Sequence, residues 1–418
     1  MAVQSVTRST ARSRTGADPA LKASGERQVP ALLLALLAAP IAAGANAPVL
    51  ILPATAGSLG VSTASVAWIV TAFAWAMAVG TPLFAGLLRS RGVTTTLRVS
   101  AAFVVAGSAL VAFAPGLAAL LAGRAGQALG GAGFVAVAMS LAAGSARRMG
   151  VITSGFGVLA ASGPLLGSVL ADAASWRVAL LISAAALVAV PVVARRAADT
   201  PVAAARGAFD VRGAGAVVAL ATSLVLLPQT GAALPVVLAA VVAAGLLVVH
   251  VRRRPEGLVP AAVVRSPRFI GASLTALAVS TSYFTLLFAL PRLITDRAGW
   301  TQSAIGVGQL AALLAGSALS WALAAASLRM GPRAVYAVIL TLGVTAPLIA
   351  AYASSALLLL VAATVGVFAA TGSSAVLSVY SGQRVPQAQR PSAIGLFMLA
   401  YQLGGAFGPA IAAVLVLG

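Results

Sequence analysis

The sequence predicts an all-α membrane protein that crosses the bilayer many times. Long apolar stretches recur along its 418 residues, and a helix of about 20 such residues crosses about 30 Å of hydrocarbon. Hydrophobic residues make up 61% of the chain and charged residues only 8%, too few to coat a water-soluble globule of this size. The stretches are continuous rather than alternating, which favours helices over a membrane β-barrel.

Thirteen spans are expected, in a group of six, a pair and a group of five. The expected spans are 30–58, 65–88, 97–115, 117–140, 149–171, 177–194, 212–228, 234–250, 270–291, 302–326, 333–352, 355–380 and 391–417. The stretch 212–250 is assigned two spans because one helix of that length would measure about 58 Å, too long for one crossing.

The spans divide the chain into six segments. They are a basic tail at 1–29, a six-helix bundle at 30–194, a linker at 195–211, the additional pair at 212–250, a second linker at 251–269 and a five-helix bundle at 270–418.

The placement of the basic residues supports this map. Of 27 basic residues, 23 fall in the tail or in loops on the tail's side, three fall on the other side, and Arg124 lies within a span. The positive-inside rule then places the N-terminus in the cytoplasm. The same rule accounts for the net charge of +20, so the bilayer is expected as the partner and nucleic acid is not. Scarce lysine with abundant alanine and glycine suggests a bacterial cytoplasmic membrane.

Enzyme chemistry is not expected. The chain has no cysteine and one histidine, and it lacks a carboxylate pair, a phosphate-binding glycine loop and a nucleotide motif. Cysteine-ligated metal and disulfides are excluded, and no cofactor or metal site is predicted. An ATP-driven pump is excluded on the same ground.

Six short motifs occur in order along the chain. They are Trp68–Phe73, Arg124–Gly131, Gly157 with Gly163-Pro164 and Gly167, Ser175–Arg177, Phe209-Asp210 with Gly213, and Tyr401-Gln402 with Gly404-Gly405. On the matching span map, the chain from about residue 30 to 418 resembles the fourteen-span drug:proton antiporters of the major facilitator superfamily. The resemblance implies two six-helix bundles around a central cavity, two extra helices between them, and multidrug efflux by alternating access. The second bundle here has only five expected spans.

Four polar residues are the candidates for the substrate cavity. Arg124 lies about 12 Å inside its span, and the resemblance gives this position a role in proton coupling or substrate binding. The alternative is an arginine that extends its side chain to the membrane surface. Gln127 lies one turn later on the same face. Asn46 and Tyr283 are uncharged groups at cavity depth, although interhelical hydrogen bonds would equally explain such residues.

An antiporter-like motif is expected in the fifth span. Pro164 interrupts the helical hydrogen-bond ladder and allows a kink, while Gly157, Gly163 and Gly167 present a smooth face for close helix approach. The resemblance implies that this motif packs the two bundles together and limits leak. Generic packing by small residues is the alternative.

Three acidic residues that the resemblance leads us to expect are missing from the chain. In the antiporters that the chain resembles, the first span carries an aspartate, and Gly44 takes that position here. Those antiporters also have a gating motif with an acid in a cytoplasmic loop of each half, and the corresponding loops at 86–92 and 328–333 lack this acid. Proton antiport usually uses a carboxylate whose pKa changes with conformation. Asp172 is the best remaining candidate for a proton site, with a solvated helix end as the alternative. A cavity with Arg124 and no carboxylate predicts a neutral or anionic substrate.

Two functions fit these patterns. The first is a secondary transporter that exports a small organic compound or drug, coupled to protons. The second is an uncoupled facilitator, or a transporter fold that no longer pumps and serves as a sensor or scaffold. The fourth- and fifth-span motifs favour the first, and the missing acids favour the second.

Overall fold

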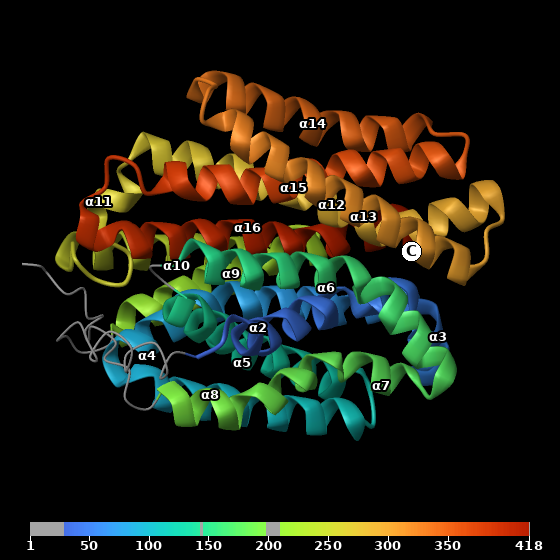
Figure 1. Ribbon diagram of the computed structural model, residues 1–418, viewed down its shortest axis with the longest axis horizontal. Helices are drawn as coiled ribbons and strands as arrows, with labels where there is room; N and C mark the ends of the chain where they lie inside the picture. The colour runs from blue at the N-terminus through green and yellow to red at the C-terminus, as the bar shows by residue number, and fades with distance from the viewer. Residues whose placement is uncertain (1–28, 143–144, 198–209, 418) are drawn as a thin grey trace, which may run out of the picture.

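The computed structural model describes residues 29–142, 145–197 and 210–417. The expected tail, apart from its last residue, and most of the first linker lie outside these residues. Every regular element in the described ranges is a helix (Figure 1). The prediction of an all-α polytopic membrane protein is therefore confirmed.

The first half of the molecule, residues 31–197, forms the lower layer in Figure 1. Its elements are α2 (Ala31–Asn46), the 3-10 segment η1 (Ala47–Leu50), α3 (Leu52–Leu59), α4 (Thr63–Ala112), α5 (Leu117–Ala142), α6 (Ala146–Ala173), α7 (Trp176–Leu180), the 3-10 segment η2 (Ile182–Ala189) and α8 (Val190–Ala197).

The additional pair and the second half follow. Their elements are α9 (Val211–Gln229), α10 (Leu234–Arg253), α11 (Ala261–Val264), α12 (Pro267–Ala298), α13 (Gln302–Ser327), α14 (Pro332–Tyr352), α15 (Ala356–Ser381), the short η3 (Gln387–Gln389), α16 (Arg390–Ala412) and the π-helical η4 (Ala413–Leu417).

The described helices account for the thirteen expected spans. Eleven of them are long and apolar enough to cross a membrane. The 50-residue α4 contains two of the expected spans, which meet at Gly92, where a φ of 78° and a ψ of −179° leave helical geometry. Glycine adopts this positive φ without the steric cost that a side chain would bring. The sixth expected span is divided between α7, η2 and α8, and therefore is not one continuous helix.

The first span is also broken, although the sequence predicts one continuous span over 30–58. Its α-helix ends at Asn46, and η1 leads through Ile51 into α3. Pro48 and Pro53 lie at this break, and proline has no N–H group to continue a helical ladder. The break leaves backbone carbonyl groups near the end of the span available to other helices.

Helix contacts define how the halves pack. In the first half α4 packs on α5 and α2 packs on α6, and in the second half α12 packs on α15 and α16. The largest contacts between the halves are α16 with α4 and α13 with α6, and α9 touches both α4 and α16. Buried residues shared by α4, α9 and α16 include Ala78, Ala221 and Ala406. The additional pair is therefore attached to both halves through α9.

The two ends of the molecule differ in charge. One end, on the left of Figure 1, carries α11 and the rest of the 254–266 connection. Most of the described arginines lie in the connections at this end. We call this the basic end. At the other end, where α4 and α13 begin, Arg177, Arg292 and Arg297 are the described arginines. We call this the arginine-poor end.

Side-chain caps fix where many helices begin. The caps whose oxygen accepts a hydrogen bond from the N–H group three residues later are Ser62, Ser145, Ser175, Asp210, Ser266, Thr301 and Ser355. Such a cap satisfies one of the N–H groups that the first helical turn leaves free.

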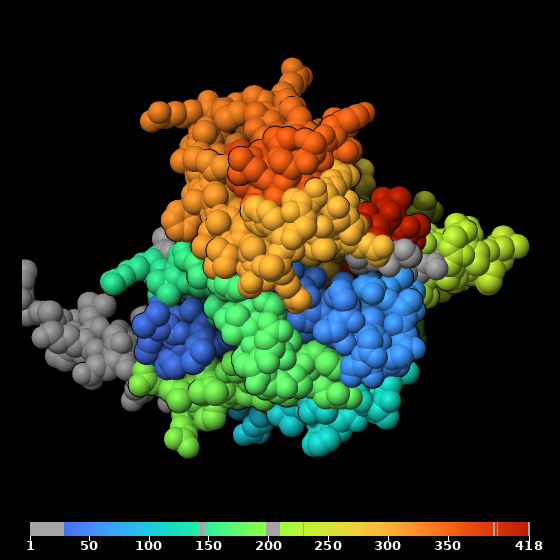
Figure 2. All heavy atoms as spheres, turned by 90° about the vertical axis from the view of Figure 1, so that its right-hand side faces the viewer, coloured from blue at the N-terminus to red at the C-terminus, as the bar shows by residue number. Residues whose placement is uncertain are grey.

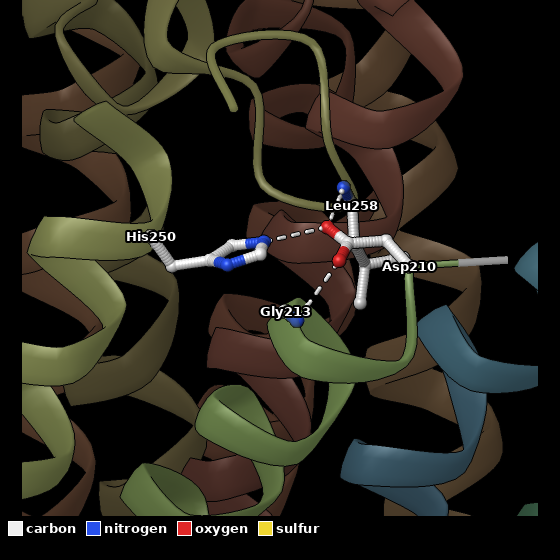
Figure 3. A network of polar contacts seen from close by, with 4 residues as sticks. All are labelled: Asp210, Gly213, His250 and Leu258. Carbon is white, nitrogen blue, oxygen red and sulfur yellow. Dashed lines mark hydrogen bonds and ion pairs between the residues drawn. The ribbon is translucent and has the colours of Figure 1, made fainter. Parts of the chain in front are cut away.

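Asp210 joins three segments at the basic end (Figure 3). Its Oδ1 accepts a 3.0 Å hydrogen bond from the Gly213 N–H of α9. Its Oδ2 lies 2.8 Å from His250 Nε2 on α10 and accepts a 3.0 Å bond from the Leu258 N–H beyond α10. The carboxylate therefore holds both helices of the additional pair and the connection to the second half in one arrangement.

Candidate functional site

Arg124 lies in α5 and is fully buried. Its Nη1 donates a 2.9 Å hydrogen bond to Gln127 Oε1, and its Nη2 donates a 2.8 Å bond to the Gly44 carbonyl oxygen of α2. The guanidinium carbon is 4.2 Å from the centre of the Phe73 ring, a cation–π contact. No carboxylate among the described residues pairs with it. The charge is therefore held by dipoles and an aromatic face inside the first half.

Gln127 completes the polar cluster around Arg124. Its Oε1 accepts from Arg124, and its Nε2 donates to Ser108 Oγ of α4 at 3.2 Å and to the Leu180 carbonyl oxygen of α7 at 3.1 Å. The two side chains thus link α2, α4, α5 and α7. Buried polar groups are stable when their hydrogen bonds are made in this way.

Two polar atoms of this region have no hydrogen-bond partner among the described residues. They are Nε of Arg124 and Oγ of Ser183, and both side chains are fully buried. Ser183 belongs to η2 and packs on Gly44, where a Cβ atom would lie 1.9 Å from its Oγ. A buried donor without an acceptor is costly, so this cluster has unused capacity to bind an anionic or hydrogen-accepting group.

The close contact with Ser183 explains why an acid cannot occupy position 44 in this packing. A Cβ at Gly44 would also lie 3.1 Å from both the Ser183 Cβ and its backbone nitrogen. A larger side chain would have to displace η2. The backbone carbonyl of Gly44, and not a side-chain carboxylate, is therefore the group that the first span presents to Arg124.

The other two cavity candidates are buried in helix contacts. Asn46 is 7% exposed, and its Nδ2 donates a 2.9 Å hydrogen bond to the Ala160 carbonyl oxygen of α6. Tyr283 is also 7% exposed and packs on Phe284, with 4.8 Å between ring centres. Arg124 and Gln127 therefore form one cluster, whereas Asn46 and Tyr283 lie in separate contacts, the latter in the second half.

The antiporter-like motif lies in an uninterrupted α6 that includes Pro164. A Cβ at Gly163 would lie 2.7 Å from the Ala43 carbonyl oxygen, and one at Gly167 would lie 2.2 Å from the Ala47 carbonyl oxygen. Gly157 has nothing within 4 Å of such an atom. Two of the three glycines thus allow α6 to approach the first span closely, within the first half of the molecule.

Asp172 lies near the end of α6 at the arginine-poor end, and its side chain is exposed. The structure places it in the last turn of the helix, apart from the Arg124 cluster. Among the described residues, no group of three His, Cys, Asp or Glu side chains could hold a metal ion.

Sequence reasoning missed the contacts that involve backbone and broken helices. Ser183 and Leu180 reach the Arg124 cluster because the sixth span is divided around them. Phe73 ends the Trp68–Phe73 motif, but its contact with Arg124 depends on how α4 and α5 pack. Only the fourth-span motif, Arg124–Gly131, gave a sequence signal for this cluster.

Comparison with known proteins identifies the family. The family model described as Major Facilitator Superfamily matches residues 32–323 and 272–418. The chain belongs to the Major Facilitator Superfamily. Its fold is a transporter fold of that superfamily. A comparison with curated proteins found no match.

Solved structures of transporters share the fold. One is a bacterial homologue of the human lysosomal transporter Spinster, inward-facing and unoccupied, at 16% identity and a TM-score of 0.61, covering 92% of this chain and 81% of that one. Another is the peptide transporter POT in complex with sulfate, at 15% identity and a TM-score of 0.62, covering 91% and 87%. A POT family transporter with a thioalcohol-conjugated peptide has 12% identity and a TM-score of 0.60, covering 92% and 90%.

Proposed function

We propose that this superfamily member is a secondary active transporter that exports a small organic compound or drug across the bacterial cytoplasmic membrane by alternating access. The segments 30–194 and 270–418 would be the two bundles that rock against each other, with 212–250 as the additional pair between them. The basic end would face the cytoplasm, as the positive-inside rule requires. The resemblance to fourteen-span drug:proton antiporters supports export in exchange for protons.

The substrate is proposed to be neutral or anionic. The observation that carries this proposal is the full burial of Arg124 without a carboxylate partner among the described residues. A buried cation would repel a lipophilic cation and attract a carboxylate or another electron-rich group. Its unpartnered Nε and the nearby Ser183 hydroxyl would donate hydrogen bonds to such a group once the bundles part.

The coupling step has one candidate acid. Asp172 is proposed as the proton site because the acids of the resemblance are absent at Gly44 and in the two gating loops. Its exposed position near a helix end would give it access to protons on the outer side. Replacement of Asp172 by Asn should then abolish substrate-evoked proton movement while substrate still binds.

An uncoupled facilitator is the second candidate function. It is favoured by one observation, that none of the described acids lies in the middle of an apolar span. A uniporter needs no group that binds and releases protons during the cycle. A transporter fold that has become a sensor or scaffold would share this absence and would move no substrate.

Proton release from energised everted vesicles would test coupling directly. A pH-sensitive dye would report dequenching on addition of cationic, neutral and anionic compounds. Dequenching by neutral or anionic compounds is the expected result. A flat response beside a positive control would contradict proton antiport, and flux of labelled anions would then separate a facilitator from a protein that does not transport.

A further inference from the structure

One hydrogen bond joins the two halves at the arginine-poor end. Gln302 Nε2 donates to the Leu50 carbonyl oxygen at 2.7 Å. Leu50 ends η1 in the broken first span, and Gln302 is the first residue of α13 in the second half. Figure 2, which looks onto this end, shows orange atoms of the second half lying against blue and green atoms of the first.

The break in the first span makes this carbonyl available. η1 ends at Leu50, and Ile51 has φ −105° and ψ 4°, outside helical geometry. Pro53, three residues beyond Leu50, has no N–H group that could donate to the Leu50 carbonyl oxygen. A backbone carbonyl that leaves a helical ladder needs another donor, and the amide of Gln302 supplies it from the opposite half.

Close packing surrounds the hydrogen bond. Gly306, one turn along α13, would place a Cβ 3.0 Å from Leu165 Cδ1 of α6 and 3.1 Å from Leu50 Cδ1. Ile305 is 2% exposed. The start of α13 is therefore in tight contact with both the first span and α6.

A cavity of about 400 Å³ lies beside this contact. It is lined from the first half by Val49, Leu50 and Thr63, and from the second half by Phe288, Arg292 and Gln302. Because its walls come from both halves, any movement that parts the halves at this end would enlarge it. Alternating access requires such parting at each end in turn.

We infer that the Gln302–Leu50 hydrogen bond is a latch that holds the arginine-poor end closed, and that this end opens through the adjacent cavity when the bond breaks. This inference rests on the proposed alternating access. The latch joins a side chain to a backbone oxygen, so its strength depends on the residue at position 302 and not on the side chain at position 50.

The chain offers a direct test because it contains no cysteine. Val49→Cys would place one thiol in the cavity wall of the otherwise unmodified protein, at a position that is 3% exposed in this structure. In purified protein in lipid nanodiscs, the rate of its labelling by a polar maleimide reports how often this end is open, whichever way the protein faces. Gln302→Ala in this background should raise the labelling rate about two- to tenfold, the effect of losing one net hydrogen bond.

A second variant separates the latch from general loosening. Gln302→Glu puts a carboxylate against the Leu50 carbonyl at neutral pH and should label faster than Gln302→Ala. At acidic pH the protonated glutamic acid can donate again, so the ratio of its labelling rate to that of the parent at the same pH should fall toward one. The ratio is the readout because acidification lowers the thiolate fraction in every variant alike. Ser303→Ala is the matched control, since Ser303 is exposed and its hydroxyl, within the described part of the chain, hydrogen-bonds to Thr301 of the same helix start. It should label at the parent rate.

The latch and the proposed function can fail separately. Equal labelling rates in the parent, Gln302→Ala and Gln302→Glu proteins would overturn the latch, whatever the transport result. A Gln302→Glu rate that exceeds the parent rate by the same factor at every pH would also overturn it. Absence of flux in the parent protein, with labelling that follows position 302 as described, would overturn the proposed transport and leave the latch standing.

Discussion

Arg124 Nη2 donates a 2.8 Å hydrogen bond to the carbonyl oxygen of Gly44, at the position where the resemblance to drug:proton antiporters places an acid. A neutral dipole thus takes the place of a negative charge. Isolated buried charges are costly, and removing one partner of a buried pair usually destabilises a protein strongly. Here the remaining acceptor, Gln127, and the ring of Phe73 complete the surroundings. The cluster is compatible with a stable fold, and it leaves an excess of positive charge.

Gln127 should be required for the stability of this cluster. Gln127→Leu would leave Arg124 Nη1 without an acceptor, and an unsatisfied buried donor costs about 1–3 kcal/mol. The double variant Arg124→Leu with Gln127→Leu should be less destabilised than the sum of the single changes, because the two residues share a hydrogen bond. Thermal unfolding of the purified protein would measure this. Additive losses would contradict a coupled cluster.

Gly44 should tolerate no side chain while Ser183 is present. A Cβ at position 44 would lie 1.9 Å from Ser183 Oγ, and overpacking of this kind costs about 1–3 kcal/mol. Gly44→Ala should therefore lower the unfolding temperature, and adding Ser183→Gly should recover part of the loss. Gly57→Ala is the control, since nothing lies within 4 Å of a Cβ there. Equal stability of Gly44→Ala and Gly57→Ala would refute the contact.

The sequence was sufficient to predict the fold class because span length and arginine placement are strong constraints. Thirteen spans were expected, and the described helices supply them. The continuity of the first and sixth spans was not predictable in the same way. Their breaks at η1 and η2 depend on which neighbour each segment packs against, as the contact between Gly44 and Ser183 illustrates. Apolar composition is the same in a broken span as in a straight one.

The site was predictable only where a polar residue stands out in an apolar span. Arg124 and Gln127 were found for this reason, and the structure brings them together. The carbonyl of Gly44 and the Leu50 carbonyl that accepts from Gln302 carry no side-chain signal. Tyr283 and Asn46 looked equally polar in sequence, yet both are buried in helix contacts. Which of these polar residues share a site depends on how their helices pack against one another, and the polarity of a residue does not reveal this.

The two ends of the antiporter-like motif should differ in how well they tolerate replacement of glycine by alanine. A Cβ at Gly167 would lie 2.2 Å from the Ala47 carbonyl oxygen, whereas one at Gly157 meets nothing within 4 Å. Gly167→Ala should lower stability by about 1–3 kcal/mol through overpacking, and Gly157→Ala should change it little. Unfolding in a mild detergent would rank the two variants. The reverse order would show that α6 and the first span are not packed as described.

Asp210 should stabilise the protein in a pH-dependent way. Burial raises the pKa of this carboxyl, but the hydrogen bonds from His250, Leu258 and Gly213 outweigh it and hold the pKa below its ordinary value of 3.8. A depressed folded-state pKa adds stability above the ordinary pKa, and this stability is lost as pH falls through the folded pKa. Asp210→Ala should therefore cost about 0.5–2 kcal/mol near neutral pH, as loss of a helix cap does.

The pH profile is the readout that identifies the carboxylate. The difference in unfolding temperature between the parent and Asp210→Ala should shrink as the pH falls below about 4. Asp296→Ala serves as the control, because this exposed acid pairs with Arg292 at 3.5 Å on the surface and surface pairs contribute little. A difference that does not shrink below about pH 4 would contradict the assignment.

Flux in proteoliposomes that contain the purified protein tests the central claim, that buried Arg124 selects a neutral or anionic substrate. Labelled organic anions, neutral compounds and lipophilic cations would be compared in the parent protein and in Arg124→Gln, which removes the charge and keeps a polar side chain. The account predicts flux of anions or neutral compounds in the parent, with anion flux lowered at least about tenfold in the variant, the effect of about 1.4 kcal/mol. Transport of cations alone, unchanged by loss of Arg124, would contradict it.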